Sequence, residues 1–386
     1  MKRLLIFLAL SALCVGASEN SVARWSADVN IHPLTTIPNR HTIHTYFNTC
    51  PESPDGKYVI FYVSTTAEGE NGEIHLLERA SGKEETLATN ITTEDAHRAA
   101  CQQWCNDGKT VAYHDCRNGQ WLVVAIDLVT RKETILARDH QLGMGSPRQK
   151  SVPIYGCHWK PGAFRDLYLV NVETAEIQTI VKVGEVRDAY GEWIKSAFGE
   201  KDVSLFFPVL SPDGKRVFFK VACGNGGDDF RTKEASNREG KFVYDIESKK
   251  LLRMYKEWGH PSWHPDSKQV FEKGNTLYDP DTGASKQFVL TPTDHPSISP
   301  DGKLFVSDAD VSKRDFAKLG DWCIAVGSTE TQDSVIVHRF NNTHGATSWR
   351  KNHPHPSFSP DGMRIYFNVN SGPWTTLYVA EAKIGQ

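Results

Sequence analysis

Apolar and polar residues alternate along most of this 386-residue chain, in short runs such as KYVIFYVS, KTVAYHD, KRVFFKV and MRIYFNV. Alternation with a period of two is typical of β-strands, and each of these runs directly follows a Ser-Pro-Asp-Gly turn or a close variant of it. Six such turns begin at Ser53, Cys105, Ser211, His264, Ser299 and Ser359, and we read WKPGA at Trp159 as a degenerate seventh. Because Asp-Gly between alternating runs is a strong hairpin signal, the pattern predicts seven two-stranded units.

A second pair of strand-like runs follows each hairpin, as in IHLLERASGKEETL and VVAIDLVTRKETIL. Seven hairpins with seven partner pairs predict an all-β fold, a seven-bladed β-propeller of four-stranded antiparallel blades. The last blade lacks an outer strand, whereas residues 28–38 (DVNIHPLTTIP) form a spare one, so we expect this N-terminal strand to close the ring. Two insertions, residues 182–204 and 222–240, exceed what blades need and are expected to carry binding groups.

The N-terminus has the pattern of a secretory signal peptide, in which Lys2 and Arg3 precede an apolar run that ends in small residues at Ala17. We therefore expect a signal peptide over residues 1–17, a single propeller domain over residues 18–386, and a periplasmic or secreted protein. A lipoprotein interpretation through Cys14 is disfavoured because Leu13 is large for the preceding position. Seven further cysteines, an odd number in an oxidising compartment, leave at least one thiol free or bound to something.

The remaining composition restricts the partners. A net charge of -3 argues against strong attraction to nucleic acid or to acidic membranes, so an anionic ligand would need a local cluster of donors. No other apolar run is long enough to suggest a membrane span, and we expect a monomer.

Histidines recur at one position of the repeat. When the turns are aligned on their Asp, the residue six positions earlier is His260, His295 and His355 in three successive blades. We call this position the inner-strand slot, because it begins the strand that lines the central channel. In the other blades that these turns identify, the slot holds Thr49, Cys101 and Phe207.

The slot histidines should meet at one mouth of the channel, where His353 can join them. Several neutral imidazoles at a partly enclosed mouth suit a divalent metal such as Mn, Zn or Ni. The alternative is structural: His-Pro-Ser could cap the start of the strand through local hydrogen bonds. That alternative is weaker for the set, since the other blades manage without histidine.

A second cluster of potential ligands precedes and follows the Cys105 turn. It contains His97, Cys101, Cys105, His114 and Cys116, with Cys157 and His158 one blade further on. Such soft ligands could bind zinc, although the spacing is not that of a standard finger. The same region offers a histidine base, His97 or His114.

The segment HPHPSF at residues 353–358 resembles the corresponding segment of the oligogalacturonate lyase family, bacterial pectin-degrading enzymes built on a seven-bladed propeller. The resemblance implies a manganese ion with His295, His353 and His355 as ligands, and it places His260 toward the substrate. The fourth ligand of that family is a glutamine, whose place is taken here by Arg350. We therefore assign Arg350 to substrate binding and leave the fourth ligand open.

The resemblance implies a polysaccharide lyase that cleaves uronic-acid oligosaccharides by metal-assisted β-elimination. Such an enzyme removes the proton at C5, neutralises the adjacent carboxylate and expels the 4-linked sugar. The family base is an arginine, for which Arg238 is the first candidate and Arg231 the second, with His260 as a further catalytic residue. His97, His114 and Tyr46 are candidates for binding the acidic oligosaccharide.

Two alternatives remain open at this point. An ulvan-type or other uronate lyase could use histidine, tyrosine and arginine on the same fold without a metal-bound carboxylate. A noncatalytic propeller resembling TolB shares the Ser-Pro-Asp-Gly turns and would serve as a protein-binding platform. The collection of histidines at one mouth favours an enzyme, since a scaffold has no need of it.

Overall fold

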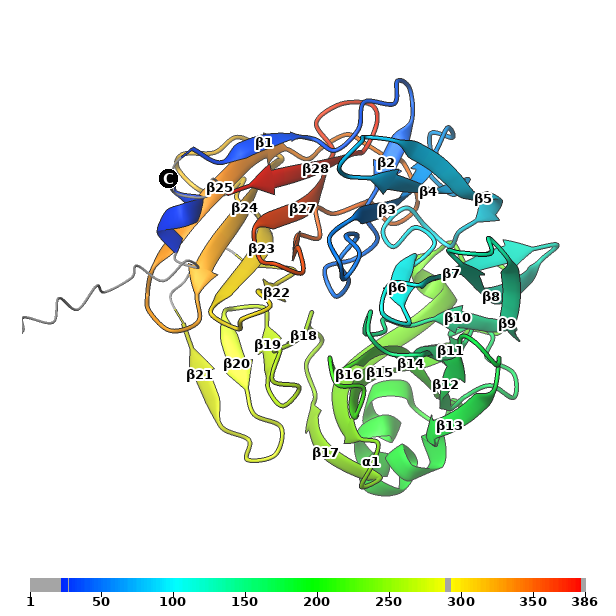
Figure 1. Ribbon diagram of the computed structural model, residues 1–386. Coiled ribbons are helices and arrows are strands. Elements are labelled where there is room, and N and C mark those ends of the chain that lie inside the picture. The colour runs from blue at the N-terminus through cyan, green and yellow to red at the C-terminus, as the bar shows by residue number, and fades with distance from the viewer. Residues whose placement is uncertain (1–21, 27, 289–292, 383–386) are drawn as a thin grey trace, which may run out of the picture.

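The alternating runs form four-stranded antiparallel sheets arranged as a ring around a central channel (Figure 1), and the described residues contain seven of them. The computed structural model describes residues 22–26, 28–288 and 293–382. The predicted all-β, seven-bladed propeller is thereby confirmed. The predicted signal peptide lies outside the described residues.

In each blade the strand named first lines the channel and the last lies at the rim. Blade one contains β2 (His41–Ile43), β3 (Tyr58–Ser64), β4 (Asn71–Glu78) and β5 (Glu84–Thr92). Blade two contains β6 (Gln103–Cys105), β7 (Thr110–Arg117), β8 (Gln120–Asp127) and β9 (Glu133–Arg138). Blade three contains β10 (His140–Leu142), β11 (Ser151–Gly156), β12 (Leu167–Asn171) and β13 (Ile177–Val181).

The remaining blades follow the same order. Blade four contains β14 (Ser204–Leu210), β15 (Arg216–Gly224), β16 (Ser236–Asp245) and β17 (Lys250–Tyr255). Blade five contains β18 (Ser262–Trp263), β19 (Val270–Glu272), β20 (Thr276–Tyr278) and β21 (Ser285–Gln287). Blade six contains β22 (Ser297–Ile298), β23 (Leu304–Asp310), β24 (Asp321–Ser328) and β25 (Ser334–Asn341). Blade seven contains β26 (Ser357–Phe358), β27 (Arg364–Val369), β28 (Thr376–Glu381) and β1 (Asn30–Pro33).

The N-terminal strand closes the ring as expected. β1 pairs antiparallel with β28, with Ile31 opposite Ala380, so the rim of the last blade comes from the start of the chain. The 3-10 helix η1 (Val22–Trp25) precedes it, and the Trp25 ring packs edge-on against Phe358 at 5.9 Å between ring centroids. Pairing of this kind removes the open sheet edge that an unclosed propeller would expose.

The seventh turn is not the one that the sequence suggested. The connection between β10 and β11 contains SPRQK, which begins at Ser146, whereas Trp159 lies after β11. The Trp159 ring stacks on Phe230 with centroids 4.8 Å apart. The interpretation of WKPGA as the blade hairpin was therefore wrong, because a Pro-Gly turn resembled the repeat more closely than SPRQ, which lacks both Asp and Gly.

The two insertions both lie at blade four. The first forms the helix α1 (Val183–Phe198), whose Trp193 ring packs against Phe242 of β16 at 5.5 Å between centroids. The second extends the pair β15 and β16, with Ala222 opposite Arg238, and carries the 3-10 helix η2 (Lys233–Ala235). None of the helices in the described part of the chain is long and apolar enough to cross a membrane.

Candidate functional site

Four histidines meet at one mouth of the channel. His97, His295, His353 and His355 each offer a ring nitrogen, and these nitrogens lie within 4.8 Å of one another. The centroid distances are 4.6 Å between His97 and His355, 4.6 Å between His295 and His355, and 4.9 Å between His97 and His353. We call this set the four-histidine group.

The sequence repeat predicted that His295 and His355 lie together, with His353 beside them on the incoming loop. His295 precedes β22, and His353 and His355 precede β26, so each lies where the chain enters an innermost strand. His355 has a backbone φ of 48°, and the slot residues Cys101 and Phe207 share this left-handed conformation with φ values of 51° and 53°. Non-glycine residues seldom adopt it. The bend is thus shared by three of the six slot residues, whereas His260, His295 and Thr49 are not among the residues with positive φ.

The fourth member, His97, comes from the loop between β5 and β6 of blade two. The loop that leads into β26 docks on it across blade one: Trp349 Nε1 donates to Glu94 O at 3.1 Å, and Asn352 Nδ2 donates to Ala96 O at 2.7 Å. His97 Nδ1 in turn donates to Lys351 O at 2.8 Å, which leaves Nε2 as its free nitrogen. His97 was expected to bind substrate or to belong to the cysteine-rich cluster, and no local sequence pattern indicates this long-range docking.

Asp308 of β23 holds two of the histidines in place. Its carboxylate lies 2.9 Å from His295 Nδ1 and accepts the backbone N–H of both His295 and His355 at 3.0 Å. A carboxylate behind an imidazole fixes the ring orientation and strengthens the opposite nitrogen as a metal ligand. Burial, followed by the charge of Asp294, raises the pKa of Asp308 to about 7.

The imidazoles are neutral and incompletely hydrogen-bonded. Burial lowers the pKa of both His295 and His353 to about 4, and it lowers the pKa of His97 and His355 well below the ordinary value. Both ring nitrogens of His355 and Nδ1 of His353 are buried without a hydrogen-bond partner. Buried polar atoms are normally satisfied, and unpaired imidazole nitrogens are ligands that suit a divalent metal.

Two aromatic rings close the channel beneath the group. The chain between β2 and β3 leaves the inner strand and carries Tyr46 and Phe47 into the channel. The Tyr46 ring lies 4.5 Å from His355, and the Phe47 ring lies 5.2 Å from His295, both between centroids. Burial raises the pKa of Tyr46, so its hydroxyl stays protonated. Tyr46 therefore belongs to the site, as its floor.

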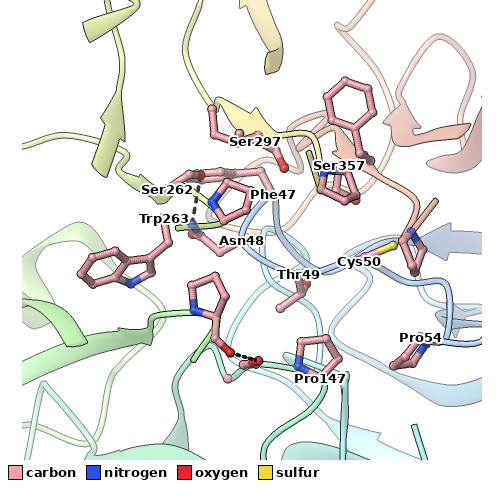
Figure 2. A pocket seen from close by; sticks show the side chains of 18 of the residues that line it. Phe47, Asn48, Thr49, Cys50, Pro54, Pro147, Ser262, Trp263, Ser297 and Ser357 are labelled. Atoms are coloured by element: carbon pink, nitrogen blue, oxygen red, sulfur yellow. Dashed lines mark hydrogen bonds between the residues drawn. The ribbon is translucent and has the colours of Figure 1, made fainter. Parts of the chain in front are cut away.

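The opposite end of the channel is a separate pocket of about 400 Å³. Figure 2 shows Phe47 and Asn48 between the serines that begin three inner strands, Ser262, Ser297 and Ser357. Asn48 Nδ2 donates to Ser262 Oγ at 3.3 Å and to Pro261 O at 2.9 Å. The segment with Tyr46 and Phe47 thus divides the channel into a histidine mouth and a turn mouth.

His260 adjoins the four-histidine group from blade five. Its ring lies 4.4 Å from His295 between centroids, and its Nδ1 lies 3.4 Å from an Asp294 oxygen. His260, Asp294 and His295 form a second set of potential ligand atoms within 4.8 Å of one another. Lys273 Nζ already occupies the same Asp294 oxygen at 2.7 Å, which makes this set the weaker candidate for a metal.

The predicted arginines differ in how firmly they are held. Arg231 makes an ion pair with Glu70 at 3.1 Å and donates to Thr93 O at 2.8 Å, so its guanidinium is fixed by the protein. Arg350 lies 3.5 Å from Asp95, and a quarter of its side chain is exposed. Arg238 is half-buried beside Phe206, and burial with the charge of Arg350 lowers its pKa to about 10.

Apart from His97, the members of the second sequence cluster belong to neither potential ligand group among the described residues. No cysteine belongs to any potential ligand group in residues 22–26, 28–288 and 293–382. Cys101 and Cys105 are buried in the hydrophobic core. His114 accepts the Leu142 backbone N–H at 3.3 Å and packs on Trp121, so it is a buried core histidine and does not join the four-histidine group.

Comparison with known proteins rests on structure alone. No protein-family model matches the chain, and no curated protein sequence matches it. An oligogalacturonate lyase in complex with manganese superimposes with a TM-score of 0.63 at 18% identity, over 93% of this chain and 95% of the other. The oligogalacturonate lyase from Vibrio parahaemolyticus gives 0.62 at 17% identity, over 93% and 95%. The chain shares the fold of oligogalacturonate lyases.

Fold likeness at such identities does not carry an activity with it. A chain of the mitotic checkpoint complex also superimposes, with a TM-score of 0.54 at 13% identity over 99% of both chains. Structures similar to this one therefore occur in lyases and in proteins of other kinds. Function has to be argued from the residues at the histidine mouth.

Proposed function

We propose that this protein is a polysaccharide lyase that cleaves uronic-acid oligosaccharides by metal-assisted β-elimination. The observation that carries the proposal is the four-histidine group, in which buried neutral imidazoles from blades two, six and seven present unpaired nitrogens to one point. A propeller that served only as a scaffold would leave these polar atoms buried at a cost of about 1–3 kcal/mol each.

The metal would be held by His97, His295, His353 and His355, with His97 in place of the glutamine that the resembled family uses. Manganese is the ion we expect, and zinc or nickel would also suit nitrogen donors. When bound, the metal supplies a Lewis acid that neutralises the uronate carboxylate. Asp308 orients His295, and Tyr46 and Phe47 seal the floor against water from the turn mouth.

The residues around the group suit an acidic sugar. Arg350 adds positive charge next to the histidines, and its charge also acts on Arg238, which stays cationic at neutral pH because its pKa is about 10. We assign both to the substrate carboxylates, while Arg231 is a weaker candidate since Glu70 already neutralises it. His260 faces the same mouth and would contact the sugar at the reacting bond.

The ulvan-type alternative receives less support from the geometry. It needs a histidine base that is free of the metal site, but His114 is buried against Trp121 and His97 lies inside the four-histidine group. The substrate class we favour is therefore an oligogalacturonate-like uronate. We further expect a monomer that carries a cleaved signal peptide and acts in the periplasm or outside the cell.

The decisive experiment supplies oligogalacturonate, alginate, ulvan and glycosaminoglycan oligomers to the purified protein, and it follows the ultraviolet absorbance of the unsaturated uronate product. Each substrate is tested with the protein as purified, with the protein after chelation, and with chelated protein to which Mn²⁺ has been restored. We expect turnover of oligogalacturonate that chelation abolishes and Mn²⁺ restores. No absorbance rise on any uronate would reject the lyase function, and chelator-insensitive turnover would reject the metal.

Metal binding can be checked without activity. Calorimetric titration of the chelated protein with Mn²⁺ should give one site per chain. His353→Ala should abolish binding, whereas His338→Ala should leave it unchanged, because His338 stacks on Phe340 away from the mouth. Equal binding by both variants would place the metal elsewhere.

A further inference from the structure

Lys220 is a buried lysine inside the core of blade four, beside the proposed site. It lies on β15 opposite Phe206 of β14, and only 2% of its surface is exposed. Its neighbours along the strand are Phe218, Phe219, Val221 and Ala222, which are buried apolar residues. Burying an ammonium group is costly unless a counter-charge accompanies it. The position therefore calls for an explanation.

The Lys220 amine has polar and aromatic neighbours but no paired acid. Nζ donates to Gly259 O at 2.9 Å, lies 3.4 Å from the centroid of the Trp258 ring and lies 5.6 Å from that of Phe207. No carboxylate lies within ion-pair distance of Nζ in the part of the chain that the structure describes. Glu272, the acid whose charge acts on it most, is already held by Lys241 Nζ at 2.5 Å and by the His260 N–H at 2.6 Å.

The charges around Lys220 favour the neutral amine. Burial lowers its pKa well below the ordinary lysine value, and nearby cations lower it further, against the opposing charge of Glu272. The charged or titratable groups that face it are Glu272, Lys241, Arg238, Arg350, His260 and His295. Lysine shifts its pKa in this way more readily than arginine, which is why buried lysines serve as general bases.

Lys220 is also adjacent to the histidine mouth. Gly259 and Trp258, which contact it, directly precede His260 in the chain, and Phe207 occupies the inner-strand slot of blade four. The Phe207 ring lies 5.4 Å from Tyr46, which lies 4.5 Å from His355, both between centroids. The 41% exposed Trp258 ring covers the amine on its outer side. For a sugar at the mouth to reach Nζ, this indole would have to turn aside.

We propose that Lys220 is the general base of the elimination, and that Arg238 binds the substrate carboxylate. This inference rests on the proposed lyase function. Neutral Nζ takes the proton from C5 of the uronate, the C5–H electron pair forms the C4–C5 double bond, and the C4–O bond breaks. The departing sugar oxygen takes a proton from water. The products are an unsaturated uronate, a shortened sugar and a protonated Lys220 that returns its proton to solvent.

The test compares Lys220→Met, Lys220→Arg and Lys220→Ala with wild type at saturating Mn²⁺, as profiles of kcat/KM against pH. Lys250→Met is the matched control, because Lys250 is exposed on β17 of the same blade. General-base catalysis contributes about 10²–10⁴-fold, so we expect Lys220→Met to lower kcat about 1000-fold while Mn²⁺ affinity is unchanged. Lys220→Arg keeps a long basic side chain at this position, and it should stay comparably slow, since arginine holds its proton more tightly than lysine.

Rescue separates a base from a structural residue. Added methylamine or ethylamine should restore part of the activity of Lys220→Ala, and the restored rate should rise with pH as the amine loses its proton. The wild-type profile should fall on its acid side as Lys220 is protonated, and this limb should disappear in Lys220→Met.

The outcomes distinguish the two proposals. Wild-type turnover with full activity in Lys220→Met or Lys220→Arg would overturn the base and leave the lyase intact. The base role would also be overturned if Lys220→Ala lost activity that added amines did not restore and if the residual activity of Lys220→Met kept the acid limb of the pH profile. If wild type acts on no uronate, the proposed function fails and the base role fails with it.

Discussion

The two ends of the seven inner strands are built on opposite principles. At the turn mouth the same device recurs: the serine hydroxyl of the Ser-Pro-Asp-Gly turn donates to the following Asp at 2.6–2.7 Å, at Ser53, Ser211, Ser299 and Ser359. The slot residue instead changes from blade to blade, among histidine, phenylalanine, cysteine and threonine, and Thr49 of blade one lies in the turn-mouth pocket. The repeated serine turn has the same structural role in each of these blades, whereas the varied slot residues contribute histidines to a single site.

The difference also appears in how polar groups are satisfied. The turn serines both donate and accept, so their hydrogen-bonding capacity is used within the turn. The histidine mouth instead leaves both nitrogens of His355 unpaired in a fully buried position. Stability explains the turn mouth, but the histidine mouth needs a ligand to explain it. Substitutions at the two ends should therefore separate activity from stability.

The largest effect should come from His355→Ala. Removing one of the four proposed ligands should weaken Mn²⁺ binding, because only three imidazoles remain to coordinate the ion. We expect kcat/KM to fall about 1000-fold or more. Urea unfolding of the chelated protein measures separately the cost of the cavity that the deleted buried ring leaves, which no lost hydrogen bond increases. His338→Ala serves as the control. Full activity in folded His355→Ala would remove the histidine mouth from the mechanism.

A second effect concerns pH. In the chelated protein His295 and His353 have a pKa of about 4, below the 6.5 expected when unfolded, so the unfolded chain binds protons first as pH falls. Stability should therefore fall between pH 6.5 and 4. Asp308 acts in the opposite direction, since its raised pKa of about 7 lets the folded state take up a proton first. A shift of one pKa unit changes the free energy of unfolding by about 1.4 kcal/mol. Because there are more histidines than the single Asp308, the destabilising contribution is the larger one.

We expect the net loss from pH 7.5 to 5 to be about 2 kcal/mol, measured by urea unfolding. His355→Phe should reduce the slope, because it removes one group that resists protonation and keeps a ring of similar size. A stability that is flat or rises toward pH 5 would contradict the assignment of neutral imidazoles.

The turn mouth should respond in stability alone. Glu52, which lines its pocket, accepts from Arg364 Nε at 2.8 Å and Nη2 at 2.9 Å and from the Tyr366 hydroxyl at 2.5 Å, thereby joining blades one and seven. Glu52→Ala removes both bonds of Arg364 to the buried acid and the partner of the Tyr366 hydroxyl, so that Arg364 keeps only Asp361, and it should cost about 3 kcal/mol of unfolding free energy. Activity per folded molecule should be retained.

Glu85→Ala is the matched control, because Glu85 also pairs with an arginine, Arg131, but at a largely exposed position. Exposed ion pairs contribute about 1 kcal/mol or less. Equal destabilisation by both variants would show that the link between the first and last blades is not special.

Much of the fold and part of the site could be predicted from the sequence, because the Asp-Gly turns recur in register with the strands. That register placed His260, His295 and His355 at one mouth, and the pairing of β1 with β28 followed from the missing rim strand. The turn at Ser146 was missed because SPRQ keeps the position of the repeat but not its Asp-Gly residues.

The missed residues depend on contacts that no local pattern encodes. His97 reaches the group only because the loop before β26 crosses to blade two, about 255 positions away in the chain. Asp308 looks like an ordinary polar residue in VSDAD. Lys220 had a signal, however: in KRVFFKV it is a lysine in an otherwise apolar run of a buried strand, where burial makes its charge costly.

The smallest expected effect lies in a single turn, at Ser299→Ala. The hydroxyl of this buried serine donates to Asp301 at 2.6 Å and accepts the Leu304 N–H at 2.9 Å, so the change removes two hydrogen bonds. We expect a loss of about 1–2 kcal/mol in urea unfolding with unchanged kcat/KM. Thr331→Ala, an exposed hydroxyl that donates to Asp333, should cost less than about 0.5 kcal/mol. A loss of activity in folded Ser299→Ala would show that the two mouths are coupled through the inner strand, and the separation of a repeated structural end from a variable functional end would then not hold.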